Sequence, residues 1–483
     1  MTDTTPATSR IWSLPVLRAF APPPETTPAE QAAHTTELVP WERPGASLRI
    51  NHRAATRGHY APSVVGAPTS TRQAEILNTA LIGPPTGTKG VVNGRDVLSR
   101  TSVTHDPVTA YNAQPREVSS PNTVVMGDVG AGKSSFVKTV CVLRPLVLTG
   151  RRAVVFDKKD QAGEGEYSGV VRRYGTEPIR FTADGTGTRL NLLDPVIARG
   201  TGIRGQARLL ATITRLARDD QHLDGAELEA LRAALRRTLA TFEDGRAPTL
   251  ADVVPNLGVI DDDQYRDLSP TAKDALHHAG LAVRWTLNGL LDEYAGLLDG
   301  ETSTCVDLTG KLTWFDISQL PDDGPAVPVV MAIGNMWMLG RLRADRGWAT
   351  TVVYEEGWHM IGGPSARLIK ANQKLSRGLG IANVFVMHKG TDIPRDSPGV
   401  TIIQEAQSIH VFRQGRPEDA AWCTDTFGFD PDTTDQITRL RDGHYVFKYG
   451  AHPETHVQHI RSNWEIDVTN TDEALAAPTE RNR

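Results

Sequence analysis

The sequence predicts an α/β fold in which a mainly parallel sheet is covered by helices on both sides. Short, β-rich apolar runs recur along the chain, and helical stretches separate many of them. Such runs are too apolar to leave one face in water, which is typical of parallel strands buried on both faces. A glycine-rich loop between one run and an amphipathic helical pattern agrees with this fold. The expected strands cover residues 122–127, 152–157, 179–182, 312–317, 350–355, 382–388, 408–412 and 444–448.

Composition and charge narrow the class of protein. The chain has 483 residues, 39% of them hydrophobic, which suffices for one large α/β domain with insertions or for two or three domains. The formal charge of −5 gives no whole-molecule reason for strong non-specific binding to nucleic acid. Cys141, Cys305 and Cys423 form no CxxC or Cys/His spacing. This argues against a disulfide framework or a structural zinc site and fits a reducing cytosol.

Membrane-spanning and signal segments are not expected. No stretch reaches the roughly 18 apolar residues of a membrane span, and residues 1–10 are too polar for a signal peptide. Residues 327–342 are nearly continuously apolar but too short to cross a bilayer, so they predict a buried core helix. We expect a cytoplasmic protein that would be held at a membrane only by other proteins.

The chain divides into five predicted segments. Residues 1–82 are rich in proline, including Pro22-Pro23-Pro24, and are expected to be largely extended or disordered. Residues 203–300 lack strand patterns and predict an all-helical insertion, with leucines at helical spacing at positions 228, 231, 235 and 239. The insertion separates the two parts of an α/β core, 83–202 and 301–465. A polar tail follows at 466–483.

A phosphate-binding loop is the most specific motif. Residues 127–134 satisfy G-x-x-x-x-G-K-[ST] between a β-branched strand and a helix, the context in which this pattern has meaning. Its backbone N–H groups would surround phosphate oxygens, Lys133 would reach the β and γ phosphates, and Ser134 would join the Mg²⁺ shell. The predicted nucleotide-binding residues are Gly127, Asp128, Val129, Gly130, Ala131, Gly132, Lys133, Ser134 and Ser135.

Hydrolysis of ATP also needs a carboxylate near Mg²⁺ and a base that orients water. Glu355 and Glu356 supply two acids at the end of the apolar strand 350–355. Because side chains alternate along a strand, Glu355 is predicted to face the metal and Glu356 to act as the catalytic base. The sequence therefore predicts an ATPase. Kinases and small GTPases share the loop, but not the helical insertion or the paired acids followed by Trp358.

The loop and the acidic strand together resemble the conjugative type IV secretion ATPases, the VirB-type or TraC-like family of the HerA/FtsK superfamily. GDVGAGKSS and VVYEEGW carry this resemblance, because the family's second motif typically ends Asp-Glu-Ala-Trp. Three other segments, at 154–167, 189–194 and 315–318, are similar to family stretches, so the resemblance covers about residues 83–455. It implies a RecA-like core that uses ATP and Mg²⁺.

Three departures from the family pattern stand out. Glu355 occupies the metal-side position where the family usually has Asp, which is one methylene shorter. His388 follows the strand where the family often has Thr-Gln, and its reading is open between a role at the phosphates and a structural one. The family's large N-terminal domain is absent or reduced to the proline-rich segment.

The resemblance also implies a ring in which a neighbouring subunit supplies an arginine to the phosphates. Arg377 is the first candidate for this arginine, and a solvated arginine at a helix end is the alternative. Arg413 and Arg416 are weaker candidates. Asp157 is open between a structural role and a place near the site.

The leading functional prediction is an ATP-hydrolysing motor of a conjugative or type IV secretion-like transfer system. We expect a homo-oligomer, in particular a hexamer, located in the cytoplasm at the inner face of the cell membrane. Membrane-embedded transfer-channel proteins are the expected partners, and DNA is a further candidate. Two alternatives stay open, namely a HerA/FtsK-like DNA translocase and a non-hydrolysing scaffold that assembles with ATP.

Overall fold

The computed structural model describes residues 47–50, 62–65, 89–161, 163–242, 245–361, 364–366, 368–370, 377–393 and 397–469. The chain forms two compact units, Met1–Ile82 and Gly83–Arg483. In the first unit, β1 (Ser47–Ile50) pairs antiparallel with β2 (Pro62–Val65). The disorder predicted for residues 1–82 stays a prediction. Apart from β1 and β2, these positions lie outside the described residues.

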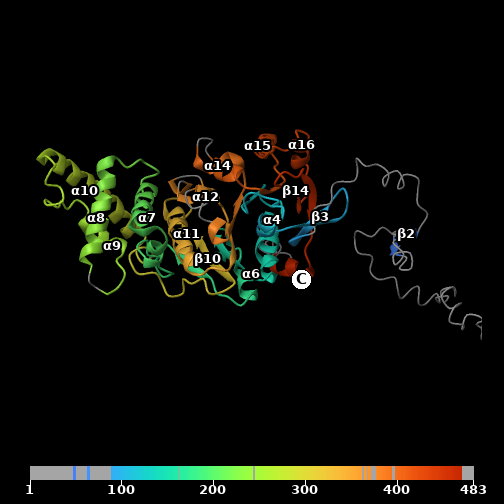
Figure 1. Ribbon diagram of the computed structural model, residues 1–483, viewed down its shortest axis with the longest axis horizontal. Coiled ribbons are helices and arrows are strands. Elements are labelled where there is room, and N and C mark those ends of the chain that lie inside the picture. The colour runs from blue at the N-terminus through green and yellow to red at the C-terminus, as the bar shows by residue number, and fades with distance from the viewer. Residues whose placement is uncertain are drawn as a thin grey trace, which may run out of the picture. The chain divides into compact units, whose positions relative to one another are not determined.

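An eleven-stranded sheet forms the centre of the second unit (Figure 1), in the order β4-β3-β15-β14-β13-β5-β12-β11-β6-β10-β9. From β13 to β9 all neighbours are parallel, whereas β14, β15, β3 and β4 pair antiparallel. The parallel strands are β5 (Thr123–Met126), β6 (Arg151–Asp157), β9 (Ile179–Thr182), β10 (Leu312–Gln319), β11 (Ala349–Tyr354), β12 (Ile381–Met387) and β13 (Ser408–Phe412). The antiparallel strands are β3 (Val91–Asp96), β4 (Ser102–His105), β14 (His444–Tyr449) and β15 (Thr455–His459).

All eight expected strands are present, and the mainly parallel sheet is confirmed. The sequence analysis missed β3, β4 and β15, and their composition explains why. They mix buried with partly or fully exposed side chains, as in VVNGRD and THVQH, so they lack the apolar runs of the central strands. A separate two-stranded ribbon joins β7 (Asp160–Gln161) to β8 (Glu164–Gly165).

Helices cover both faces of the sheet and build two apolar layers. The alternation of β6 illustrates the arrangement, because Val154 and Phe156 join one layer while Ala153 and Val155 join the other. The helices near the sheet are α4 (Pro107–Asn112), α5 (Lys133–Phe136) with its continuation η4 (Val137–Leu143), η5 (Pro145–Val147), α6 (Ser168–Arg173), α11 (Ala326–Ala344), α12 (Trp358–Ile361), η7 (Arg377–Leu379), η8 (Gly390–Asp392), α14 (Pro398–Gln404), α15 (Pro417–Phe427), α16 (Thr433–Thr438) and α17 (Asn463–Thr469).

The core helix predicted at residues 327–342 corresponds to α11, which is buried along most of its length. Its first residues follow Pro325, and it ends at Ala344 after two basic residues, which suit the negative end of a helix dipole. Within the described part of the chain, no helix is long and apolar enough to cross a membrane.

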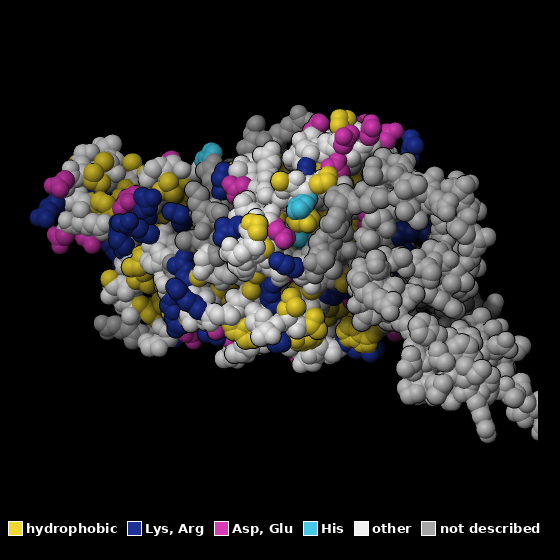
Figure 2. All heavy atoms as spheres, turned by 45° about the vertical axis from the view of Figure 1, so that its right-hand side comes forward, with side chains coloured by type: hydrophobic (Ala, Val, Ile, Leu, Met, Phe, Trp, Pro, Cys, Tyr) yellow, Lys and Arg dark blue, Asp and Glu magenta, His cyan; other side chains and the backbone are white. Residues whose placement is uncertain are grey.

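A helical region projects from the sheet between β9 and β10 (Figure 1). It contains α7 (Pro195–Leu216), α8 (Gly225–Thr241), α9 (Leu250–Val253), η6 (Val254–Asn256) and α10 (Pro270–Glu293). Its first helix, α7, is kinked at Gly202, whose backbone is not helical, so only the part from Pro195 to the kink precedes the predicted boundary at 203. Because α7 packs along α11, it also belongs to the core. Basic side chains gather over this region in Figure 2, next to hydrophobic patches. The exact segment boundaries stay a prediction.

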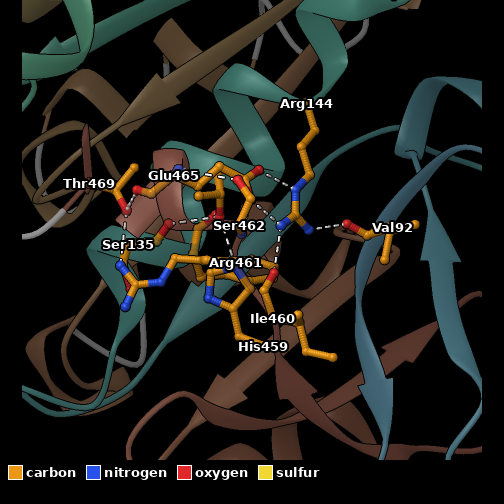
Figure 3. A network of polar contacts seen from close by, with 11 residues as sticks. Val92, Ser135, Arg144, His459, Ile460, Arg461, Ser462, Glu465 and Thr469 are labelled. Atoms are coloured by element: carbon orange, nitrogen blue, oxygen red, sulfur yellow. Dashed lines mark hydrogen bonds and ion pairs between the residues drawn. The ribbon is translucent and has the colours of Figure 1, made fainter. Parts of the chain in front are cut away.

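The C-terminal helix α17 is anchored to the helix that follows the glycine-rich loop. Arg144, at the end of η4, donates from Nε to Glu465 Oε1 at 2.8 Å and from Nη2 to Glu465 Oε2 at 3.0 Å (Figure 3). The same guanidinium also donates to the backbone carbonyl of Ile460. Residues 466–469, the first positions of the predicted tail 466–483, form the last turn of α17.

Candidate nucleotide-binding site

The glycine-rich loop leaves the sheet at the end of β5, between β12 and β13. Two glycines make its path possible. Gly132 has φ 97°, and a Cβ there would lie 3.0 Å from the Gly443 nitrogen. A Cβ on Gly127 would lie 2.5 Å from Cβ of Phe412. Side chains at these positions would collide with the neighbouring backbone or side chain, so the close turn requires glycine.

The loop is held at its base and open at its tip. The Asp128 nitrogen donates to the carbonyl oxygen of Arg413 at 2.8 Å, and Asp128 Oδ2 accepts from the Gly415 nitrogen at 2.5 Å. Val129, at the tip, is 74% exposed. Ser134 lies half-buried in the first turn of α5, and the Ser135 hydroxyl donates to the Gly132 carbonyl oxygen at 2.9 Å.

Lys133 turns back into the loop that precedes it. Its Nζ donates to the carbonyl oxygens of Gly127 and Asp128, the latter at 2.7 Å, and lies 3.2 Å from His388 Nδ1. Burial lowers the pKa of this ammonium group to about 8, although the carboxylate of Glu355 opposes the shift. The cation is therefore held by partners that phosphate oxygens could replace.

His388 connects Lys133 to Glu356. The other ring nitrogen, Nε2, lies 3.0 Å from Glu356 Oε1. An ammonium group has only donors, so Nδ1 accepts and Nε2 carries the hydrogen that is donated to Glu356. Trp358 Nε1 donates to the second carboxylate oxygen of Glu356 at 3.0 Å. The carboxylate is thus fixed by two donors.

Glu356 has a backbone conformation that non-glycine residues rarely adopt. Its φ is 51°, which costs on the order of 1–3 kcal/mol and is found mostly where surrounding contacts enforce it. Those contacts are present, because the nitrogens of Glu355 and Gly357 donate to strand carbonyls of Phe156 and Val386 at 3.0 and 2.8 Å. Burial raises the pKa of Glu356, but the hydrogen bonds from His388 and Trp358 and the positive charge of Lys133 outweigh it, so the pKa lies below its ordinary value.

Glu355, the first residue after β11, points into the interior. It is 4% exposed, and its Oε1 accepts from the Tyr167 hydroxyl at 2.5 Å. Burial, reinforced by the nearby carboxylate of Glu166, raises its pKa to about 7. The two adjacent acids therefore occupy different environments.

A buried charged cluster lies next to Glu355. Of its members, only Asp157 was a candidate from the sequence. Lys138, five residues after Lys133 on the same helix, lies 3.4 Å from Glu166, and both side chains are 1% exposed. Asp157 is also buried, and its Oδ2 accepts from the Tyr167 nitrogen at 2.9 Å. Burial and the neighbouring carboxylates raise the pKa of Asp157. A lysine within the apolar run VKTVCVL was the sequence signal for this cluster.

The structure describes the three candidate arginines to different extents. Arg377 begins η7, but its side chain lies outside the described residues. Arg413 pairs with Asp442 at 2.9 Å, and Arg416 precedes α15. The loop that carries Arg413 and Arg416 also holds the base of the glycine-rich loop through the contacts of Asp128.

The residues present fit a magnesium-bound nucleotide. No group of three or more His, Cys, Asp or Glu in the described part of the chain could hold a metal on its own. Mg²⁺ with a nucleotide needs no such group, since phosphate oxygens and water supply most of its shell. Ser134 and Glu355 stay the predicted protein contributions.

The order of the strands places the glycine-rich loop and the acidic pair close together in the sheet. A single strand, β12, separates the loop strand β5 from the acidic strand β11, and His388 follows β12 directly. A parallel sheet with a glycine-rich loop after a central strand and an acidic pair after a nearby strand is the arrangement of the RecA-like P-loop fold.

Two solved structures share this fold over most of their length. VirB4 of Thermoanaerobacter pseudethanolicus superposes with a TM-score of 0.62 at 18% identity, covering 79% of this chain and 98% of that one. The plasmid coupling protein TrwB in complex with ADP and Mg²⁺ gives 0.51 at 14% identity, covering 82% of this chain and 96% of that one. No protein-family model and no curated protein matches the chain. The likeness confirms the predicted fold.

Proposed function

We propose that this protein is an ATPase that powers a conjugative or type IV secretion-like transfer system. The observation that carries the proposal is the contact series Lys133–His388–Glu356, which joins the phosphate loop to the acidic strand. It occurs in a fold shared with VirB4 and with TrwB, which is described as a bacterial conjugative coupling protein.

Nucleotide binding would use the groups of the loop. Backbone N–H groups from Gly127 to Ser135 would surround the phosphates at the start of α5, where the helix dipole favours negative charge. Lys133 Nζ would exchange its two carbonyl partners for phosphate oxygens. The Ser134 hydroxyl and the Glu355 carboxylate would hold Mg²⁺, which neutralises charge on the phosphates during hydrolysis.

Glu356 is the proposed base. Its lowered pKa keeps it ionised at neutral pH, and the donors His388 and Trp358 fix its orientation. The carboxylate would take a proton from the attacking water, and the hydrogen bond from His388 Nε2 would then hold the carboxyl group in place. Lys133, on the opposite side of the same ring, links this step to the phosphates.

The assembly is part of the proposal. A hexamer would place Arg377 of each subunit near the nucleotide of its neighbour, where its charge would stabilise the transition state. The proposed partners are membrane-embedded transfer-channel proteins, with DNA as a candidate cargo. These partners would locate the protein at the inner face of the cell membrane.

ATP turnover of the wild-type protein and of Glu356→Gln tests the proposal, with and without single- and double-stranded DNA, while light scattering follows oligomer size. We expect Glu356→Gln to bind nucleotide and lose turnover, whereas Lys133→Ala should lose binding. Normal turnover by Glu356→Gln would refute the assigned base.

The remaining outcomes separate the alternatives. Turnover that depends on Glu356 but not on DNA supports a secretion motor that awaits its membrane partners. Turnover that rises strongly with DNA supports a HerA/FtsK-like translocase. Assembly with ATP and no turnover supports a scaffold.

A further inference from the structure

Tyr167 is the buried partner of the acid that is proposed to hold Mg²⁺. Its side chain is 0% exposed, and its hydroxyl donates to Glu355 Oε1 at 2.5 Å. Among the residues that the structure describes, Tyr167 is the one hydrogen-bond donor to this carboxylate. A short hydrogen bond to a carboxylate is charge-assisted and strongly directional.

Tyr167 is itself held at its backbone and at its ring. The Tyr167 nitrogen donates to Asp157 Oδ2 at 2.9 Å, which fixes the backbone at the start of α6. Lys138 Nζ lies over the ring, 5.2 Å from its centroid, and pairs with Glu166 at 3.4 Å. These contacts leave the hydroxyl little freedom to move away from Glu355.

A glutamate needs such a partner more than an aspartate does. Its side chain has one more rotatable bond, so an unrestrained Glu355 could place its carboxylate in several positions. The hydrogen bond to Oε1 selects one of them, and in the proposed role the second oxygen would contact the metal ion. Because the bond is buried, water cannot take the place of the phenol.

We propose that Tyr167 is a positioning residue that holds Glu355 in the orientation in which it contacts nucleotide-bound Mg²⁺. This inference rests on the proposed nucleotide function. Tyr167, from the first part of the core, would thus support an acid that follows a strand of the second part.

Tyr167→Phe removes the hydroxyl and keeps the buried ring. We expect the Mg²⁺ concentration for half-maximal binding of a fluorescent ADP analogue to rise roughly tenfold, corresponding to about one lost charged hydrogen bond. Binding of the same analogue in EDTA should not change. Tyr174→Phe is the matched control, because Tyr174 lies at the end of the same helix and is 38% exposed.

A double-mutant cycle separates positioning from general destabilisation. Glu355→Asp shortens the side chain by one methylene and should break the contact with Tyr167. Adding Tyr167→Phe should then change the Mg²⁺ requirement little, whereas independent effects would add. Equal effects of Tyr167→Phe in both backgrounds would refute the inference, as would an unchanged Mg²⁺ requirement in the single variant. Thermal melts establish that each variant is folded at the assay temperature.

The binding assay needs no turnover. A wild-type protein that binds the ADP analogue with Mg²⁺ but does not hydrolyse ATP would refute the proposed ATPase and leave this test intact. Hydrolysis by the wild type, together with wild-type Mg²⁺ dependence in Tyr167→Phe, would refute only the inference about Tyr167.

A second, independent observation is a basic groove between α7 and α8, with a volume of about 580 Å³. Its apolar lining includes Ile203, which is 52% exposed, and Leu228. Arg204 and Arg208 line it from α7, and Arg232 and Arg236 line it from α8. No acidic side chain described in the structure belongs to this lining. Glu229, near the α8 wall, pairs with Arg236 at 2.7 Å.

This combination of an apolar groove with basic walls fits an amphipathic helix whose flanks are acidic. Nucleic acid is the less suitable occupant, because the apolar lining offers nothing to a phosphate backbone. The groove lies in the helical region over which Figure 2 shows basic side chains gathering beside hydrophobic patches. We infer that α7 and α8 bind an acidic amphipathic helix of a partner protein.

Fluorescence anisotropy of the full chain tests this docking surface with a labelled peptide of about 18 residues, or five helical turns, that carries leucines on one face and glutamates on its flanks. A peptide with lysines in place of the glutamates and a single-stranded DNA are the comparison probes. We expect only the acidic peptide to bind, and Arg204→Glu with Arg208→Glu to weaken it at least about tenfold.

Exposed arginines far from the groove provide the matched control, in which Arg346→Glu is combined with Arg439→Glu. This control should bind the acidic peptide like the wild type. Equal binding of both peptides, or no binding of the acidic one at millimolar concentration, would overturn the inference. DNA binding that is lost in the groove variant would assign the surface to nucleic acid instead.

Discussion

The Nε2 atom of His388 lies 3.0 Å from Oε1 of Glu356, and this contact joins the ends of two adjacent parallel strands, β12 and β11. The other nitrogen of the ring lies 3.2 Å from Lys133 Nζ. One imidazole therefore contacts both the proposed base and the lysine of the phosphate loop. The sequence left open whether His388 has a structural role or a role at the phosphates. In the structure it lies between two proposed catalytic groups.

His388→Ala should lower ATP turnover on the order of a hundredfold, the low end of what a positioned proton-transfer group contributes. Affinity for ADP should change little, because the loop and Lys133 remain. His388→Gln should lose less, since an amide can still donate to Glu356. Steady-state turnover and ADP titrations check this, with the exposed His278→Ala as control. Full activity of His388→Ala would make this histidine structural.

Nucleotide affinity should fall above a pH of about 8, where the buried Lys133 of the free protein loses its charge. Bound phosphate favours the charged lysine, so binding near this pH should take up protons. The affinity should decrease by up to about tenfold per pH unit above it. Calorimetry in buffers of different ionisation enthalpy measures the proton uptake. Adenosine, which lacks phosphate, should show no such slope, and a pH-independent affinity for ADP would contradict the position of Lys133.

The ionised side chain of Glu465 should stabilise the fold at neutral pH and lose this effect at acidic pH. Burial opposes its ionisation, but the hydrogen bonds from Arg144 and Ser462 lower its pKa to about 2 from the ordinary 4.5. The unfolded chain therefore binds a proton at higher pH than the folded chain does. The stabilisation is complete above about pH 4.5 and is lost as pH falls toward 2.

The comparison of Glu465→Gln with the wild type tests this contribution. Urea unfolding should show a loss on the order of 1 kcal/mol at neutral pH, which is typical of a partly exposed, bidentate ion pair. The difference should shrink as pH falls below about 4.5, because the carboxyl group of the unfolded wild-type chain takes up its proton there while the folded chain keeps its charge until about pH 2. A difference that is constant with pH would mean that the ion pair does not stabilise the fold. Glu405→Gln is a comparison for an exposed acid elsewhere on the surface.

Arg377→Ala should lower turnover without much loss of nucleotide binding if the arginine acts on a neighbouring subunit. Mixed oligomers that combine Arg377→Ala with Glu356→Gln should recover part of the activity, because some interfaces then contain both intact groups. The controls are Arg413→Ala and Arg416→Ala, each mixed in the same way. An effect of Arg377→Ala on binding alone would count against a trans-acting role.

Much of the fold was predictable because its signals are local. Apolar runs such as those of β6 and β12 identify buried parallel strands, and the glycine-rich loop identifies the turn from β5 into α5. The strands β4, at one edge of the sheet, and β3, next to it, were missed because short, half-exposed strands resemble loops in composition. The paired acids were found for the same reason as the loop, since they directly follow an apolar strand.

The sequence by itself determined which segments become strands, where the phosphate loop lies, and that Glu355 and Glu356 face different directions. The first two properties depend on local backbone preferences, which neighbouring residues set, and the third on the turn that directly follows β11. Only the tertiary structure decided that Tyr167 meets Glu355, 188 residues away, and that His388 bridges Lys133 and Glu356. Those contacts depend on the order of strands in the sheet, which is set by how the two apolar layers pack and not by any local pattern.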